Sequence, residues 1–128
     1  MRKKIRVCKN CGKILNERHK IFCDNNCQSQ YQYKSYIERW KEGKEDGMRG
    51  KYTISKYIIR YMFEKYNFSC QKCGWNLKNP VTNNSPLEIH HIDGNYKNNS
   101  EDNLELLCPN CHSLTTNYKR LNRDGRKK

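Results

Sequence analysis

Two stretches of the chain carry apolar residues at helical spacing. The first predicts a helix over residues 28–40, with Asp24 as its N-cap and an end near Gly43. One face of this helix carries Tyr33, Tyr36, Ile37 and Trp40. Because tyrosine and tryptophan side chains supply much of the buried surface of small cores, we interpret this face as a packing surface of the N-terminal unit; an exposed stacking platform is the alternative.

The second stretch predicts a helix that begins after the N-cap Ser55 and extends to Tyr66. Its apolar side carries Ile58, Ile59, Met62, Phe63 and Tyr66. Between the two helices, residues 41–53 alternate glycines with charged side chains, a composition typical of a flexible linker. The linker is therefore expected to separate an N-terminal unit from a C-terminal unit.

The C-terminal third has the pattern of a strand, a loop, a second strand and a helix. Residues 87–92 and 104–107 predict the two strands, and residues 93–102 between them are polar and rich in turn formers. Pro109 suits the first turn of a helix over residues 109–118. Helices together with a small hairpin predict an α+β fold.

Composition indicates that apolar burial alone does not hold this fold together. Only 34% of the 128 residues are hydrophobic, against about 45–50% in an average domain. The length allows one compact domain or two very small ones. The chain has eight cysteines in four close pairs: Cys8 with Cys11, Cys23 with Cys27, Cys70 with Cys73, and Cys108 with Cys111.

The four pairs make two sets of four thiolates, which is the ligand number of a tetrahedral structural zinc site. The alternative is a disulfide framework, which requires an oxidising compartment. The basic N-terminus is not followed by the apolar segment of a secretory signal, and no apolar run approaches the ~18 residues of a membrane span. We therefore expect two structural zinc ions in a cytoplasmic protein without membrane contact.

The net charge points to a polyanionic partner. Lysines and arginines number 26 against 13 acidic residues, a formal charge of +13. The excess gathers at the two ends of the chain, where basic arms would neutralise phosphates and release counterions; a solvated, unstructured tail is the alternative. The residues expected to contact nucleic acid are Lys3, Lys4, Arg6, Arg49, Lys51, Lys119 and Arg120.

Histidines concentrate beside the second cysteine set. His90 and His91 are adjacent in the first predicted strand, so their side chains point to opposite faces. One of them can bind a metal while the other faces a reacting water. On the following helix Cys111 and His112 are about 100° apart, so the thiolate can turn to zinc while the imidazole turns to the hairpin. The zinc ion then positions the site without performing the chemistry.

Residues 70–118, about two fifths of the chain, resemble the HNH endonuclease family, whose ββα-metal fold carries a His-Asn-His signature. The family pattern is met at His90-His91, at Asn103-Leu104 and at Cys108-Pro109-Asn110-Cys111-His112. The resemblance implies that His91 is the general base and that Asn103 fixes the loop and orients this base. It also implies that His90 and His112 hold a catalytic divalent ion.

The resemblance also implies a reaction, the hydrolysis of DNA phosphodiester bonds to 5′-phosphate and 3′-hydroxyl products. A neutral histidine is suited to take a proton from water, and a cation offsets charge on the phosphate. Some relatives have a further metal-binding histidine where this chain has Thr116. Among Mn²⁺, Mg²⁺, Ni²⁺ and Zn²⁺, an imidazole ligand set favours the three transition-series ions over Mg²⁺.

Together these features predict a small zinc-stapled α+β protein in four parts. The parts are an N-terminal four-cysteine zinc finger with a helix (1–43), a charged glycine-rich linker (44–54), a ββα-metal HNH nuclease domain with the second zinc site (55–122) and a basic tail (123–128). One active site in a monomer or weak dimer predicts nicking of double-stranded DNA in a bacterial or phage-infected cell. A zinc-dependent DNA-binding module without catalysis and an RNA-acting enzyme are the alternatives.

Overall fold

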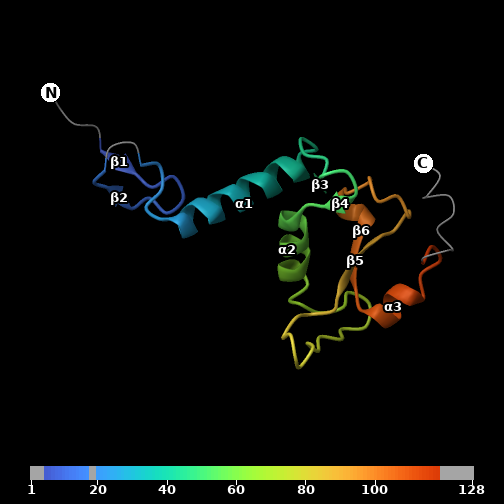
Figure 1. Ribbon diagram of the computed structural model, residues 1–128. Coiled ribbons are helices and arrows are strands. Elements are labelled where there is room, and N and C mark those ends of the chain that lie inside the picture. The colour runs from blue at the N-terminus through green and yellow to red at the C-terminus, as the bar shows by residue number, and fades with distance from the viewer. Residues whose placement is uncertain (1–4, 18–19, 119–128) are drawn as a thin grey trace.

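Small antiparallel hairpins and helices build the described chain, residues 5–17 and 20–118 of a computed structural model (Figure 1). The predicted α+β class is therefore confirmed. None of the helices in these two ranges combines the length and the apolar character needed to cross a bilayer. Some predicted nucleic-acid contacts lie outside the described residues, as does the predicted tail: Lys3, Lys4, Lys119, Arg120 and residues 123–128.

The N-terminal unit consists of a two-stranded ribbon followed by the longest described helix. Strands β1 (Arg6–Val7) and β2 (Ile14–Leu15) pair antiparallel, and helix α1 spans Asn25–Lys41. The Asp24 carboxylate accepts a hydrogen bond of 2.7 Å from the backbone N–H of Cys27, so the predicted N-cap is confirmed. The ribbon stands at the far end of α1 from the rest of the molecule (Figure 1).

The C-terminal half of α1 packs against helix α2 (Lys56–Lys65), which Ser55 caps as predicted. Their shared core consists of Ile37, Trp40, Ile58, Met62 and Leu104, with the tyrosines of both helices around it. The aromatic face of α1 is thus a packing surface, as we expected. Its partner is the C-terminal unit rather than a separate N-terminal core, which corrects that part of the prediction.

The expected flexible linker is partly ordered. It contains the antiparallel strands β3 (Met48–Arg49) and β4 (Thr53–Ile54), joined by a turn at Gly50. Gly47 precedes β3 at φ +76°, and a Cβ placed on it would lie 2.6 Å from Cβ of Asn99. Glycines among charged residues suit tight turns as well as flexible linkers, so their composition alone did not distinguish the two.

Strands β5 (Glu88–His91) and β6 (Leu104–Leu107) form the hairpin predicted for the C-terminal third, with His91 opposite Leu104. A 3₁₀ turn, η1 (Glu101–Asn103), leads into β6. Behind the hairpin lies a second core of Leu87, Leu106, Leu107 and the buried cysteines Cys70 and Cys108, with Phe63 of α2 and Tyr66 just after that helix packed against it.

Helix α3 (Pro109–Ser113) is shorter than the predicted helix over 109–118. The hydroxyl of Thr115 donates a 2.8 Å hydrogen bond to the carbonyl of His112. The backbone N–H of Thr115 donates to the same carbonyl at 3.2 Å, so the chain turns with the tighter i→i−3 bonds that are common where α-helices end. Thr116 therefore lies beyond the end of α3 and does not share a helical face with His112.

Candidate active site

The four sulfurs of each cysteine set converge on one point. Cys23 Sγ lies 3.7 Å from Cys11 Sγ and 3.4 Å from Cys27 Sγ, and in the second set Cys73 Sγ and Cys108 Sγ are 3.7 Å apart. Within each set all sulfurs lie within 4.8 Å of one another. Zinc–sulfur bonds of about 2.3 Å place tetrahedral sulfurs about 3.8 Å apart, and a disulfide requires about 2.05 Å. Each set, whose cysteines are all free, has the geometry of a metal site.

Local backbone geometry prepares one sulfur of the second set, that of Cys70, for a metal. Burial raises the pKa of Cys70, but hydrogen bonds from the backbone N–H groups of Cys108, Cys73 and Lys72 outweigh burial and lower the pKa to about 6. Gly74, directly after this pair, has the φ of +79° needed for the tight turn. Cys70 is therefore largely thiolate at neutral pH, and the thiolate is the form that binds metals.

The second cysteine set anchors a pair of histidine rings. His90 lies on β5 and is 7% exposed, while His112 lies on α3 directly after Cys111, and their ring centroids are 5.2 Å apart. Burial is the main cause that lowers the pKa of His90, and the nearby His112 ring adds to it. His90 is therefore neutral at physiological pH, as a metal ligand must be.

A carboxylate that we did not predict orients one of these rings. Glu88 Oε2 lies 2.5 Å from Nδ1 of His112, and Glu88 is two residues before His90 on the same face of β5. The Nδ1–H group donates to the carboxylate, which leaves Nε2 of His112 free to bind a metal, the usual arrangement of a carboxylate beside a metal-binding histidine. The alternation of β5 placed Glu88 and His90 on one face and could have suggested this contact.

His91 faces away from the His90–His112 pair and toward the loop between β5 and η1. Its Nε2 lies 2.6 Å from Oδ1 of Asn99, a loop residue that is 4% exposed. The structure thus brings His90 and His112 together and gives His91 a different polar partner, as the alternation of the strand requires. Asn99 was not singled out from the sequence, because several asparagines share this loop.

Asn103 holds the same loop closed without contacting the ring of His91. Its Nδ2 donates to Asp93 Oδ1 at 2.9 Å and to the carbonyl of Asn98 at 2.8 Å, and its Oδ1 accepts from the backbone N–H of Asp93. Burial raises the pKa of Asp93, but hydrogen bonds from Asn98, Asn95 and Asn103 outweigh burial and lower it. The carboxylate of Asp93 therefore belongs to the structure of the loop, a segment predicted from its turn formers.

Residues 70–117, which contain this hairpin, loop and helix, match the profile of the family described as HNH endonuclease. The chain carries an HNH endonuclease domain. The family predicted from the sequence is thereby confirmed, and with it the ββα part of the predicted fold.

Two known proteins resemble more of the chain than the HNH domain alone. The chain is 36% identical over 101 residues to the H-N-H endonuclease F-TflIV of Escherichia phage T5, which covers 77% of this chain and 40% of that protein. It is 31% identical over 133 aligned residues to the Zorya protein ZorE of Escherichia coli, with 84% and 31% covered. The chain thus spans less than half the length of either relative. No solved structure matches it significantly.

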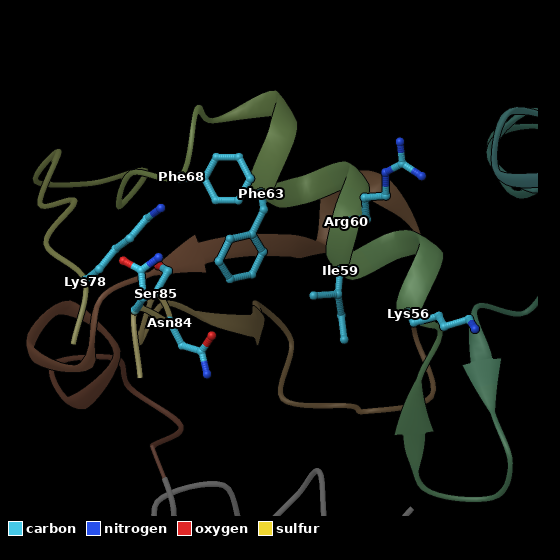
Figure 2. Close-up of a pocket in the computed structure, with 9 residues that line it drawn as sticks. Lys56, Ile59, Arg60, Phe63, Phe68, Lys78, Asn84 and Ser85 are labelled. Atoms are coloured by element: carbon cyan, nitrogen blue, oxygen red, sulfur yellow. The ribbon is translucent and has the colours of Figure 1, made fainter. Parts of the chain in front are cut away.

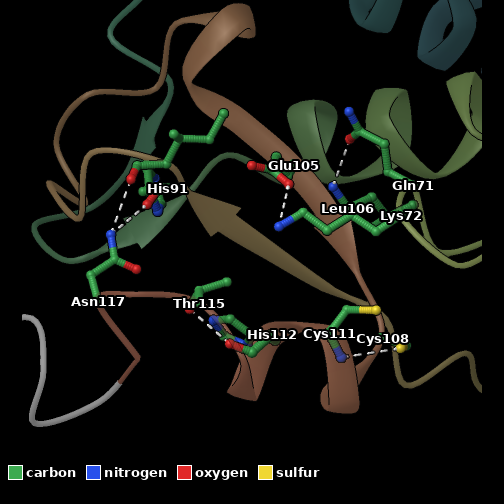
Figure 3. A network of polar contacts seen from close by, with 11 residues as sticks. Gln71, Lys72, His91, Glu105, Leu106, Cys108, Cys111, His112, Thr115 and Asn117 are labelled. Atoms are coloured by element: carbon green, nitrogen blue, oxygen red, sulfur yellow. Dashed lines mark hydrogen bonds and ion pairs between the residues drawn. The ribbon is translucent and has the colours of Figure 1, made fainter.

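The end of the HNH domain is tied back to its first strand. Asn117 Nδ2 donates to the backbone carbonyl of Ile92 at 3.1 Å, and its distance to that of His91 is 3.4 Å (Figure 3). On α3 the backbone N–H of Cys111 points to Cys108 Sγ at 3.5 Å. The segment after α3 therefore fixes the backbone of β5 where His91 begins the loop.

A hollow of about 560 Å³ lies between α2 and the loop before β5 (Figure 2). Phe63 and Phe68 form its apolar wall, with ring centroids 5.6 Å apart. Lys56, Arg60 and Lys78 supply its positive charge. None of the histidines of the HNH domain lines this hollow, so it is separate from the His90–His112 pair.

The predicted nucleic-acid contacts that fall on described residues are exposed. Arg6 lies in β1, and Arg49 and Lys51 lie at the tip of the β3–β4 ribbon. Lys51 Nζ lies 5.4 Å from the ring centroid of Tyr52, whose own ring packs 6.0 Å from that of Tyr96 in the HNH loop. The ribbon therefore presents positive charge next to the loop that follows His91.

Proposed function

We propose that this protein is a metal-dependent endonuclease that hydrolyses phosphodiester bonds of double-stranded DNA, with His91 as the general base. The observation that carries the proposal is that the three histidines of the HNH domain lie in two different places. His90 and His112 pair their rings at 5.2 Å, while His91 faces the loop on the other side of β5. An HNH domain with this arrangement has separate groups for holding an ion and for accepting a proton.

The residues present fit a divalent ion held by His90 and His112. His90 is buried and neutral, and Glu88 leaves Nε2 of His112 available. With imidazole ligands the site suits Mn²⁺, Ni²⁺ or Zn²⁺ better than Mg²⁺. When bound, the ion offsets negative charge on the phosphate and on the leaving oxygen.

The protein's own residues supply the remaining steps. His91 takes the proton from the attacking water, and Asn103 keeps the loop after β5 in the shape that presents His91. Attack in line with the 3′ oxygen leaves a 5′-phosphate and a 3′-hydroxyl. One such site in a monomer cuts one strand, so we infer nicking as the primary reaction.

The rest of the chain holds the duplex. Zinc in the set of Cys8, Cys11, Cys23 and Cys27 makes the N-terminal unit a zinc finger, and zinc in the set of Cys70, Cys73, Cys108 and Cys111 braces the HNH domain. Exposed Arg6, Arg49 and Lys51 bind phosphates, together with Lys3, Lys4, Lys119 and Arg120. Eight unoxidised cysteines suit a reducing bacterial or phage-infected cytoplasm.

The test is cleavage of supercoiled plasmid by the full chain, loaded with zinc, in the presence of Mn²⁺ or Mg²⁺. We expect nicked circles from the parent protein and none from His91→Ala, with two zinc ions per chain in both proteins by elemental analysis. Equal zinc content shows that a loss of cleavage is not a loss of fold. RNA of matched length is digested in parallel to identify the substrate.

Equal cleavage by the parent and His91→Ala would reject His91 as the base. Tight, salt-dependent retention of uncut plasmid with every ion would instead identify a DNA-binding module without catalysis. Cleavage of RNA but not of DNA would reject the proposed substrate.

A further inference from the structure

Asn99 is the most buried polar residue of the loop that follows β5, and it makes contacts on both sides of its amide. Its Oδ1 lies 2.6 Å from Nε2 of His91. Its Nδ2 lies 3.2 Å from the backbone carbonyl of Asp46 and 3.0 Å from Sδ of Met48. Oxygen and nitrogen of an amide are told apart by their partners, and a carbonyl oxygen can only accept a hydrogen bond. The amide atom that faces the carbonyl of Asp46 must therefore be the donor Nδ2, and the atom that faces His91 must be Oδ1.

This assignment determines the tautomer of His91. Oδ1 has no hydrogen, so the 2.6 Å contact requires a hydrogen on Nε2 of the ring. A neutral imidazole with its hydrogen on Nε2 has its lone pair on Nδ1. Only the nitrogen with the lone pair can accept a proton from water, so the amide of Asn99 selects which ring atom can do so.

Asn99 is itself held by elements that precede the HNH domain. The indole N–H of Trp40, at the end of α1, donates a 2.6 Å hydrogen bond to the backbone carbonyl of Asn99. Asp46 and Met48, at the start of the β3–β4 ribbon, receive the amide hydrogens. Gly47 leaves no room for a side chain between this ribbon and Asn99. The position of the amide is therefore determined from three directions.

We propose that Asn99 is a positioning residue for His91: its side-chain amide fixes the ring and places the accepting lone pair on Nδ1. The proposal rests on the proposed function of His91 as base. It assigns to Asn99 the orienting role that the family resemblance implied for Asn103, which contacts the loop backbone and Asp93 instead. It also makes Trp40 and the β3–β4 ribbon part of the catalytic unit.

The test compares full-length variants by the rate of plasmid nicking at saturating DNA. Asn99→Leu removes both the acceptor and the donor, and we expect a loss of about 100-fold, the scale found when a catalytic group is misplaced by about 1 Å. Asn99→Asp keeps an acceptor toward His91 and loses the donor toward Asp46. If the acceptor is what matters, Asn99→Asp recovers at least about ten-fold of that loss. Asn76→Leu, at an exposed asparagine, is the matched control.

A spectroscopic measurement separates positioning from simple stabilisation. With ¹⁵N-labelled histidine, two-bond ¹H–¹⁵N spectra of the zinc-loaded parent should show His91 with its hydrogen on Nε2, assigned by loss of its signals in His91→Ala. Asn99→Leu should show a mixture of tautomers. A hydrogen on Nδ1 of His91 in the parent would overturn the proposal.

The kinetic outcomes distinguish this inference from the proposed function. If Asn99→Leu nicks as fast as Asn76→Leu while His91→Ala is inactive, Asn99 does not position the base, and the base assignment stands. If Asn99→Asp is as slow as Asn99→Leu, the amide serves only to join the loop to the ribbon, and the proposal is wrong. Nicking by His91→Ala at the parental rate would defeat the proposed function itself.

Discussion

Replacing Gly47 by alanine tests the link between the β3–β4 ribbon and the active site, and Gly50 provides a matched control. The two glycines lie in the same ribbon with nearly equal φ angles of +76° and +70°. A Cβ on Gly50 would meet nothing within 4 Å. A Cβ on Gly47 would lie 2.6 Å from Cβ of Asn99 and 2.8 Å from Cδ1 of Ile58. The two variants therefore share the backbone strain and differ in the contacts with Asn99 and Ile58.

The expected magnitudes follow from this difference. An L-residue in the left-handed region costs about 1–2 kcal/mol, so Gly50→Ala should lower the free energy of unfolding by about that amount. Gly47→Ala has the same strain and adds overpacking against a buried asparagine and a buried isoleucine, a further cost of about 1–3 kcal/mol. Because the Asn99 Cβ belongs to the displaced side chain, Gly47→Ala should also slow nicking about 100-fold at saturating DNA.

Two measurements are needed for each variant: unfolding by denaturant, and plasmid nicking at a temperature where both variants are folded. The stability difference between Gly47→Ala and Gly50→Ala measures the crowding, and the rate difference measures its effect on His91. Equal nicking rates, with Gly47→Ala the less stable of the two, would refute the reasoning that the ribbon sets the position of Asn99.

Two further predictions concern carboxylates near the site. Glu88→Gln removes the charge that faces Nδ1 of His112, so the Mn²⁺ concentration for half-maximal nicking should rise about ten-fold. Glu38→Gln, at an exposed glutamate of α1, is the control, and identical Mn²⁺ curves for Glu88→Gln and Glu38→Gln would contradict the orienting role. Burial raises the pKa of Glu101, but hydrogen bonds from Tyr61 and Lys65 outweigh burial and lower it. A lowered pKa stabilises the folded state at pH above the unfolded value of about 4.3, and this stabilisation is lost as pH falls toward the folded value. The free energy of unfolding of Glu101→Gln should therefore be about 1 kcal/mol lower than that of the parent. Measured by denaturant unfolding, this difference should stay constant from pH 8 to 5. A difference that changed across this range would show that another group titrates.

The elements with the strongest local signals were predictable from the sequence. Strong N-cap residues, Asp24 and Ser55, mark the starts of α1 and α2, and turn formers separate β5 from β6. The spacing of the cysteines predicted their two clusters, because four sulfurs around one ion satisfy a local rule of coordination. Helix caps and turns depend on residues that are neighbours in sequence, and the cysteine clusters depend on one interaction, the binding of sulfurs to a metal ion.

The features that the sequence did not reveal depend on packing between distant segments. The ribbon of residues 48–54 meets the HNH loop through the close fit of Gly47 against Asn99, which is far along the chain. The aromatic face of α1 packs on α2 rather than within its own unit, and periodicity identifies an apolar face without identifying its partner. Asn99 lies among other asparagines of the same loop, so only its burial and its 2.6 Å contact with His91 distinguish it.

Similarly, the length of the last helix could not be read from composition. Residues 109–118 contain no proline after the first turn and no glycine, yet α3 ends at Ser113. The backbone N–H and the hydroxyl of Thr115 both donate to the carbonyl of His112, the tighter i→i−3 pattern that is common where α-helices end. A propensity summed over ten residues does not detect such local bonds at a helix end.

Helix α1 sets the distance between the cysteine-rich N-terminal ribbon and helix α2, against which its other end packs (Figure 1). It has 17 residues, and a rise of about 1.5 Å per residue gives it a length of about 26 Å. This length corresponds to about seven or eight base pairs of a B-form duplex, which rises about 3.4 Å per pair. A duplex bound at the cysteine-rich tip of α1 would meet the HNH site most of a helical turn away, and after one strand is cut the flank between the tip and the site would still be held at the tip.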